Sequence, residues 1–556
     1  MTKSDNRSSS FESIELRLYL FLSFVLFLVL GYRATLGVDF TDESYHLANA
    51  YKFFLGAIPF KDELFSAQGF ALLTKPIVST LINLTGSTAG IVLKMRWAFL
   101  CFQFLISLFL FSVLKRTFST ASALAASLSY FCFVPMNLFS LFYVTLGVGF
   151  LALGMGCFYL ASQSQKPSTA FFLGSFALAL SFIAHPVMAI PISVIAALIS
   201  WPLDKNGFKR LLLFSTSFLF LVAVFFVIYG FSPLDWLRAV QGSRHYNAEI
   251  GNVWGFPRLL LALKTLVMWG PWLSFILIIF GFLVFATYRN QAVGKYQFIA
   301  LVLLPLFIFF NSRMSAGGIG PAGYLLSLGW LSFILVWSTV PLPEAKRFLL
   351  WFLLPAAAAT LAMSFTSNSG VSSTSTGFLP ILPVALLLLS SAIQKSFPKS
   401  SFFKPYLGSI VILFFLLIFV RGTFQSAFKE PRFSELKHPI SAGPFQGLKT
   451  SQFRKDFIEK LHTHLNQLKD NKKSILFTCF FPAGYLLTDL KPGYFFVWGA
   501  PGNGNNLFDS ELLVRVFDKT YPLLGISSQS CQPLQDEVSG KKGQLVKEEF
   551  YEIGLF

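Results

Sequence analysis

Acidic residues are scarce over most of this chain. Of its 556 residues, 44 are Lys or Arg and only 26 are Asp or Glu, and just twelve of these acids precede Arg421. None of the twelve lies within the long apolar runs. Ion-coupled transport usually requires ionisable residues inside membrane spans. The absence of Asp and Glu from the apolar runs therefore counts against a transporter.

Cysteine is also rare, and the motifs of several site classes are missing. Of five Cys, three (Cys101, Cys132 and Cys157) lie in apolar runs, where Cys usually packs as a small apolar residue. Cys479 and Cys531 lie near the C-terminus, and either a disulfide or two free buried thiols would fit them. No His cluster indicates a metal site. No Gly-rich loop and no DxD-type acid pair indicates a nucleotide-sugar site.

The chain is rich in apolar side chains. Hydrophobic residues make up 54% of the sequence, Phe occurs 68 times, and the mean hydropathy is +0.63. Soluble globular proteins are nearer ~45–50% apolar. Runs of about 18 or more apolar residues recur between Leu18 and Val420, and each can cross a bilayer as a helix. The composition predicts an all-α polytopic membrane protein, whose first span is retained because no cleavage site of small residues follows it.

About thirteen spans fit these runs. They are placed at residues 18–36, 97–114, 121–140, 143–162, 168–184, 186–201, 211–230, 271–288, 296–311, 322–340, 348–364, 378–394 and 407–421. Lys and Arg gather in alternate short loops, as at 115–116 and 346–347, whereas the opposite short loops hold almost none except Arg313. Positive loops stay in the cytoplasm. We therefore expect the N-terminus (residues 1–17) inside and, with an odd number of spans, the C-terminus outside. This pattern accounts for the net charge of +18 without nucleic acid.

The C-terminal tail, residues 422–556, has a different composition. It holds the other fourteen acids, and short β-like runs such as SILFTCFF and YFFVWG are separated by Pro, Gly and Asn. The stretch FRKDFIEKLHTHLNQLKDN predicts an amphipathic helix whose apolar residues fall near helical spacing, namely Phe453, Phe457, Leu461 and Leu465. The sequence thus predicts a membrane domain at 18–421 followed by a small extracytoplasmic α/β domain.

An outer loop at about 37–96 follows the first span and concentrates the scarce acids. Its first part, VDFTDESYHLANAYKFFLGAIPFKDELF, contains five of the twelve, namely Asp39, Asp42, Glu43, Asp62 and Glu63. So strong a concentration in one short segment indicates a polar site at the membrane surface.

Within this loop the sequence predicts a surface helix. Thr41 is a good N-cap and Gly56 a good stop, and between them Asp42, His46 and Asn49 share one face. The helix dipole and the free N–H groups of the first turn hold a carboxylate there in its ionised form. Asp42 and its neighbour can therefore act as a general base or merely cap the helix, and the pattern alone leaves both open.

Basic residues follow in the same loop and in a second outer loop at about 231–270. Lys75 lies in the apolar stretch LLTKPIVSTLINL, where a Lys can hold a phosphate or snorkel to the surface. The second loop contains QGSRHYNAEIGNVWGFPR, in which Arg244, His245 and Tyr246 suit phosphate or sugar hydroxyls. Each of these residues also fits a solvated loop.

The order of these features resembles a known family. A DE pair after the first span, a surface helix, the turn in GAIPFKD and then KPI resemble the polyprenyl-phosphate-sugar-dependent glycosyltransferases of the GT-C fold. Members include the protein O-mannosyltransferases and the bacterial enzyme that adds aminoarabinose to lipid A. The resemblance is strongest over about residues 30–120, and the plan of spans plus an outer C-terminal domain extends it over the chain. FFNSRMSAGGIGPAGYLLSL is similar to a family loop in which a basic residue, here Arg313, follows a Ser, but the Pro-rich ending is absent.

The resemblance implies a mechanism. The family's donor is a sugar on a lipid phosphate, and transfer inverts the anomeric centre. Asp42 would be the general base for an acceptor hydroxyl, and Glu43 would orient it or bind the acceptor. A lipid phosphate is already a weak base when it leaves, so it needs nearby cations rather than a second acid. Lys75, Arg244 and Arg313 are the candidates.

The remaining candidates for substrate contacts are His46, Asp62, His245 and Tyr246. We expect a structural role for Glu63, while His185, before a Pro at a helix end, either points into the cavity or is an ordinary helix-end residue. No cofactor is required; related oligosaccharyltransferases hold a metal between paired acids, but no ligand spacing here demands one. The expected partners are a lipid-linked sugar donor, an envelope lipid, polysaccharide or protein acceptor, and the bilayer. The expected location is the bacterial cytoplasmic membrane.

Other functions stay open at this point. One is a lipid flippase or transporter, which the acid-free spans disfavour. A second is an enzyme of related architecture that moves a whole glycan, such as an oligosaccharyltransferase or a polymer ligase. A third is a membrane scaffold that carries the tail as a binding module, and this one leaves the acidic loop unexplained.

Overall fold

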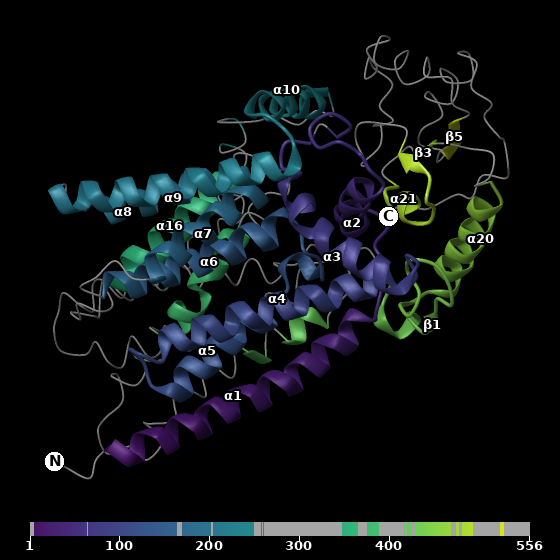
Figure 1. Cartoon of the computed structure of the whole chain (residues 1–556). Coiled ribbons are helices and arrows are strands. Elements are labelled where there is room, and N and C mark those ends of the chain that lie inside the picture. The colour runs from purple at the N-terminus through teal and green to yellow at the C-terminus, as the bar shows by residue number, and fades with distance from the viewer. Residues whose placement is uncertain are drawn as a thin grey trace.

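The computed structural model describes residues 5–249, 347–364, 375–387, 416–468 and 474–492, with short gaps inside these ranges, and a strand at 523–526. These residues are mainly helical. Figure 1 shows the long helices running side by side, with the N-terminus at one end of the bundle and the C-terminal elements at the other.

The N-terminal half of the chain is a series of helices. They are α1 (Asp5–Ala34), α2 (Asp42–Phe54), α3 (Gly69–Thr85), α4 (Ile91–Leu114), α5 (Thr120–Cys132), α6 (Tyr143–Ser162), α7 (Thr169–Ala184), α8 (Ala189–Ser200), α9 (Lys205–Tyr229) and α10 (Pro233–Glu249). Short 3-10 turns, η1 (Pro135–Asn137) and η2 (Pro186–Met188), precede α6 and α8. Further along the chain come the π-helical turn η3 (Leu349–Leu353), α16 (Leu354–Ser364) and η4 (Ser375–Ile381).

Among the described residues, three helices are long and apolar enough to cross a membrane: α4, α6 and α9. Shorter apolar helices cover Tyr19–Ala34, Gly69–Thr85, Thr120–Cys132, Thr169–Ala184, Pro186–Ser200, Leu350–Ser364 and Thr376–Leu387. The spans expected at 271–288, 296–311 and 322–340, and most of the one at 407–421, lie outside the described residues. The structure thus has the apolar helices of a polytopic protein, while the number near thirteen and the sidedness stay predictions.

The span expected at 121–140 is wrong in its second half. Helix α5 ends at Cys132, and residues 133–142 continue largely without helix around η1. Pro135 brings no N–H group to a helix, and both residues after it take positive φ angles, 53° and 56°. We call residues 133–142 the α5–α6 segment.

Because the α5–α6 segment is not helical, its backbone carbonyls need other hydrogen-bond donors, and side chains supply two of them. Gln103 Nε2 on α4 donates to the carbonyl of Phe133 at 3.0 Å, and Thr145 Oγ1 donates to the carbonyl of Ser140 at 2.8 Å. Non-helical backbone is tolerated at membrane depth only where protein covers it or it lines a cavity. Nearly all of the segment is buried, so it meets this condition.

The apolar stretch around Lys75 forms the 17-residue helix α3, which contains Pro76. Because proline has no N–H group, the carbonyl of Leu72 loses its helical partner. Tyr229, the last residue of α9, donates its hydroxyl to this carbonyl at 2.7 Å. The pair joins α9 to the helix that carries Lys75.

The C-terminal region combines short strands with helices. β1 (His438–Pro439) and β2 (Lys449–Thr450) pair antiparallel, and β3 (Ser474–Phe477) lies between β4 (Lys491–Pro492) and β5 (Leu523–Ile526) in a parallel sheet. The predicted strand in SILFTCFF is confirmed as β3. The run YFFVWG and the two cysteines of the tail lie outside the described residues.

The predicted amphipathic helix is confirmed as α20 (Gln452–Leu468), although one residue of its expected apolar face is wrong. Phe457 and Leu465 are buried, but Phe453 is 62% exposed and Ile458 is fully buried instead. The i, i+4 spacing drifts around a helix of 3.6 residues per turn, so four residues at that spacing do not all face one side. A short helix, α21 (Ala483–Leu486), lies beside α2 in Figure 1.

The hydroxyl of Tyr229 gives a test of this packing. We expect Tyr229→Phe to lower the free energy of unfolding by about 1 kcal/mol, because one net hydrogen bond is lost and a buried carbonyl is left without a donor. Denaturant unfolding of the full chain in detergent measures the change. Tyr32→Phe, at a tyrosine that is 58% exposed, is the matched control. Equal stability of all three proteins would contradict the role of Tyr229.

Candidate active site

Asp39 fixes the start of α2. It is 3% exposed, and its Oδ1 accepts the N–H and the hydroxyl of Thr41 at 3.0 and 2.7 Å, while Oδ2 accepts the N–H of Glu43 at 2.7 Å. Thr41 is the N-cap residue of α2, as expected, but its side chain makes no capping bond; Asp39, two residues earlier, accepts the free N–H of Glu43 instead. Burial raises the pKa of Asp39 to about 6, and the nearby Asp42 carboxylate adds to the rise.

Glu43 is bound by a single arginine. Arg96 Nε donates to Glu43 Oε1 at 2.6 Å and Arg96 Nη2 donates to Oε2 at 2.5 Å, a bidentate pair in which both side chains are buried. The same guanidinium donates to the carbonyls of Ala34 at 2.6 Å and Gly37 at 2.9 Å. One side chain of α4 thus holds the end of α1, the following turn and the first turn of α2.

Asp42 is the first residue of α2, and its side chain is half-buried. The hydroxyl of Thr41 donates to its Oδ2 at 3.3 Å. Its charge acts on Asp39 and on Tyr143, the first residue of α6.

The other two acids of the loop fix the turn after α2. Glu63 is fully buried and pairs with Lys52 at 3.2 Å, and the same ammonium donates to the carbonyl of Asp62 at 2.5 Å. Asp62 Oδ2 accepts the N–H of Ile58 at 2.7 Å. Asp62 therefore closes the turn through a backbone group, and Glu63 has the structural position expected of it.

His46, one turn after Asp42 on α2, lies in a cluster of aromatic side chains. Its ring stacks on Phe142 at 4.6 Å between centroids and makes edge contacts with Tyr45, Phe70 and Tyr143. It is 5% exposed, burial lowers its pKa to about 3, and its Nδ1 has no hydrogen-bond partner among the residues that the structure describes. The imidazole is therefore neutral at physiological pH and is covered on several sides.

Two more polar residues belong to this neighbourhood. Asn49, one turn after His46 on α2, is fully buried, and in the described part of the chain neither its Oδ1 nor its Nδ2 has a hydrogen-bond partner. His185, before η2, is 6% exposed and contacts the ring of Tyr143 at 4.9 Å. Buried polar groups without partners need an explanation, such as an ordered water or a site function.

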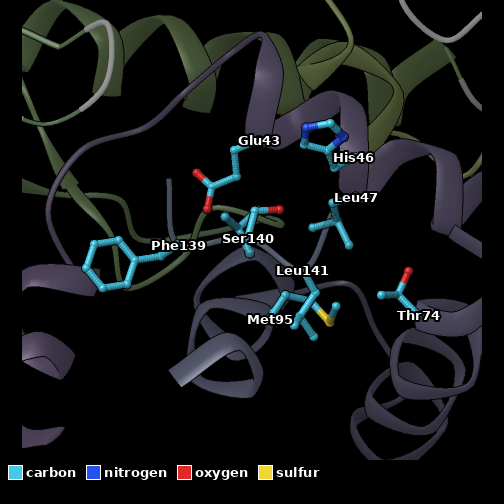
Figure 2. A pocket seen from close by; sticks show the side chains of 9 residues that line it. Glu43, His46, Leu47, Thr74, Met95, Phe139, Ser140 and Leu141 are labelled. Carbon is cyan, nitrogen blue, oxygen red and sulfur yellow. The ribbon is translucent and has the colours of Figure 1, made fainter. Parts of the chain in front are cut away.

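A small cavity lies against the inner face of α2 (Figure 2). Its volume is about 10 Å³, and it is lined by residues of α2, α3, α4 and the α5–α6 segment, namely Glu43, His46, Leu47, Thr74, Val92, Met95, Phe139, Ser140 and Leu141. Such a space holds about one water molecule. It is too small for a sugar ring, and Asp42 is not among the residues that line it.

The structure places the predicted cations as follows. Lys75 follows Thr74 on α3, which packs against α2; its side chain is half-buried and has no ion-pair partner in the described part of the chain. Arg244, His245 and Tyr246 lie on α10 rather than in a loop. Arg313 lies outside the described residues.

No group of three or more His, Cys, Asp or Glu side chains that could hold a metal ion occurs among the described residues. That the protein requires no metal ion stays a prediction. The arrangement instead offers a half-exposed carboxylate at a helix start, beside a helix that carries a lysine.

Asp39, as the cap of α2, and the α5–α6 segment are parts of this site that were not predicted from the sequence. A readable signal for Asp39 was an acid four residues before Glu43, at the position from which a side chain can reach the first N–H groups of a helix. For the segment, the Pro-Met-Asn triplet was the signal of a break.

Comparison with models of protein families gives no match, and neither does comparison with curated proteins. Among solved structures, the chain is similar to the oligosaccharyltransferase of Archaeoglobus fulgidus tethered to an acceptor peptide (TM-score 0.47, 12% identity, 85% of this chain and 63% of that one). It is also similar to the same protein in complex with Zn and sulfate (TM-score 0.41, 12% identity, 81% and 58%). The chain spans less than two thirds of either. At these values the similarity assigns no activity.

Arg96 gives a test of the site's framework. We expect Arg96→Gln to lower the free energy of unfolding by about 3–5 kcal/mol, because Glu43 is left buried without a counter-charge. Arg238→Gln, in an ion pair on α10 whose arginine is 66% exposed, should cost less than about 1 kcal/mol. Denaturant unfolding in detergent compares them. If the double variant Arg96→Gln with Glu43→Gln is no more stable than Arg96→Gln alone, the pair is not the source of the loss.

The buried imidazole predicts a pH dependence of stability. Because the pKa of His46 falls from 6.5 to about 3 on folding, its contribution is complete above pH 6.5 and is lost as pH falls below that value. We expect the wild type to lose about 1.4 kcal/mol per pH unit between roughly pH 6.5 and 4 relative to His46→Phe. Unfolding curves at pH 8, 6 and 5 measure this difference. Parallel curves for the two proteins would show that His46 titrates normally.

Proposed function

We propose that this chain is a membrane-embedded inverting glycosyltransferase. It moves a sugar from a polyprenyl-phosphate donor to an acceptor hydroxyl, with Asp42 as the general base. The observation that carries the proposal is that the acids of the loop differ in burial and in their partners. Asp39, Glu43 and Glu63 are buried and bound to structural partners, whereas Asp42 is half-exposed at the start of α2.

The position of Asp42 suits base catalysis. Its backbone is fixed on both sides, by the Asp39 cap and by the pair of Glu43 with Arg96, so the carboxylate has little freedom to move. A positioned base contributes about 10²–10⁴-fold to a reaction. In the proposed step Asp42 accepts the proton of the acceptor hydroxyl, the hydroxyl oxygen bonds to the anomeric carbon, and the bond from that carbon to the phosphate oxygen breaks.

The leaving lipid phosphate needs positive charge, and Lys75 is our first candidate to supply it. Its helix packs on α2, and its ammonium is not neutralised by any described residue. Arg244 on α10 and Arg313 are further candidates. Glu43 acts by holding α2 in place. His46, Asp62, His245 and Tyr246 remain candidates for contacts with the sugar or the acceptor.

The alternation of charged loops supports a place in the bacterial cytoplasmic membrane with the site on the outer face. A donor linked to a lipid fits a site at the membrane surface. The acceptor is then a hydroxyl of an envelope lipid, polysaccharide or protein.

Substitution of the base tests the proposal. We expect Asp42→Asn to lower the rate of sugar transfer by about 10²-fold or more, because the amide cannot accept the proton. The measurement is transfer of isotope-labelled sugar from synthetic polyprenyl-phosphate donors to an envelope extract by the purified protein in vesicles. Asp456→Asn, at a half-buried position on α20, is the matched control.

Equal transfer by Asp42→Asn and the wild type would move the base to another residue. If the wild type transfers nothing from any donor but moves labelled lipid across the bilayer, the protein is a flippase and the proposal fails. Transfer of a whole glycan instead of one sugar would identify a ligase of related architecture.

A further inference from the structure

The C-terminal region binds the chain that leads into α2. We call residues 35–41, between α1 and α2, the linker. The N–H of Gly37 donates to the carbonyl of Lys449 at 2.8 Å, the N–H of Lys449 donates to the carbonyl of Thr35 at 2.8 Å, and the N–H of Ala483 donates to the carbonyl of Phe40 at 3.2 Å. Residues more than 400 positions away in the sequence thus hold the linker as a neighbouring strand would.

One ion pair binds both backbone groups of a single linker residue. The N–H of Val38 donates to Glu430 Oε1 at 2.5 Å, and Arg454 Nη1 donates to the carbonyl of Val38 at 2.9 Å. Arg454 Nη1 also lies 3.4 Å from Glu430 Oε2, and the hydroxyl of Thr450 donates to Glu430 Oε1 at 2.7 Å. Because the side chain of Glu430 is fully buried, these bonds form where water does not compete.

Aromatic packing closes the same contact two residues later. Phe40 is 4% exposed and contacts the rings of Phe457 and Phe481, at 5.9 and 5.6 Å between centroids. The guanidinium of Arg454 lies 5.1 Å from the centre of the Phe40 ring. Arg454 therefore touches the linker at two points, its backbone at Val38 and its side chain at Phe40.

We propose that Glu430 and Arg454 are positioning residues for Asp42, which makes the C-terminal region part of the active-site framework rather than an appended module. The proposal rests on the function assigned above to Asp42. Val38 lies four residues before Asp42, so a shift of the linker by one peptide moves the Asp39 cap and with it the first turn of α2. Misplacement of a reacting group by about 1 Å can cost about 10²-fold in rate.

The test uses the full-length protein in vesicles and compares Arg454→Gln with Lys460→Gln, which removes the same charge from an exposed position of α20. Two quantities are measured, the hydrogen exchange of backbone amides in residues 35–44 and the kcat and KM of sugar transfer. For Arg454→Gln we expect exchange about tenfold faster or more in these residues, since charge-assisted bonds are lost, with α20 itself unchanged. We expect kcat to fall by about 10²-fold at a donor KM close to that of the wild type.

Arg454→Lys separates charge from geometry. Its ammonium still pairs with Glu430 but cannot reach the Val38 carbonyl and cover Phe40 with one planar group. We therefore expect exchange and kcat between those of the wild type and Arg454→Gln.

Unchanged exchange in Arg454→Gln would overturn the proposal, and so would an unchanged kcat in a variant whose linker exchanges fast. A higher donor KM at an unchanged kcat would assign Arg454 to substrate binding and would also overturn the proposal. If the wild type transfers no sugar, the proposed function fails by itself, and the exchange measurement alone decides whether the pair holds the linker.

Discussion

The buried guanidinium of Arg96 is the interaction on which the candidate site depends. It is bound by both oxygens of Glu43 and by the backbone carbonyls of Ala34, at the end of α1, and Gly37, in the linker. Three helices that would otherwise be free to slide past one another are thereby fixed at one point. A buried charge pair of this kind contributes little net stability, but a helix that shifts leaves a charge without its partner. The pair therefore acts chiefly on geometry, and the geometry that it fixes is the first turn of α2.

The remaining acids of the loop extend the same framework. Asp39 caps α2, Glu63 is neutralised by Lys52, and Asp62 closes the turn between them. In a chain with so few carboxylates, most of those gathered here are used to build one rigid loop at the end of a helical bundle. Only such a framework leaves Asp42 both fixed in place and half-exposed. The concentration of acids in the sequence is thus explained mainly by structure, and Asp42 is the member that we propose as the base.

Much of this was readable in advance where a local rule decides. The boundaries of α6 at 143–162 and of α7 follow from apolar runs and their polar ends, and α20 follows from its amphipathic pattern. Prediction failed where the role of a side chain depends on its tertiary contacts, or where the backbone leaves the helix within an apolar run. Asp39 makes the capping bond expected of the Thr41 side chain because it folds back over the first turn. The α5–α6 segment looked like the end of a span because its side chains are apolar, although its backbone is not helical.

The sequence by itself determined the class of protein, the helices with their apolar faces and the acidic loop after the first span, because composition and periodicity act within a few turns of chain. The roles within that loop were decided by tertiary structure. Whether a carboxylate is a cap, a counter-ion or a base depends on what lies within about 3 Å of it. For Glu43 that neighbour comes from α4, and for the linker before Asp42 it comes from Glu430 and Arg454, nearly 400 residues or more along the chain. Contacts over such separations have no local signature, because only folding brings their two ends together.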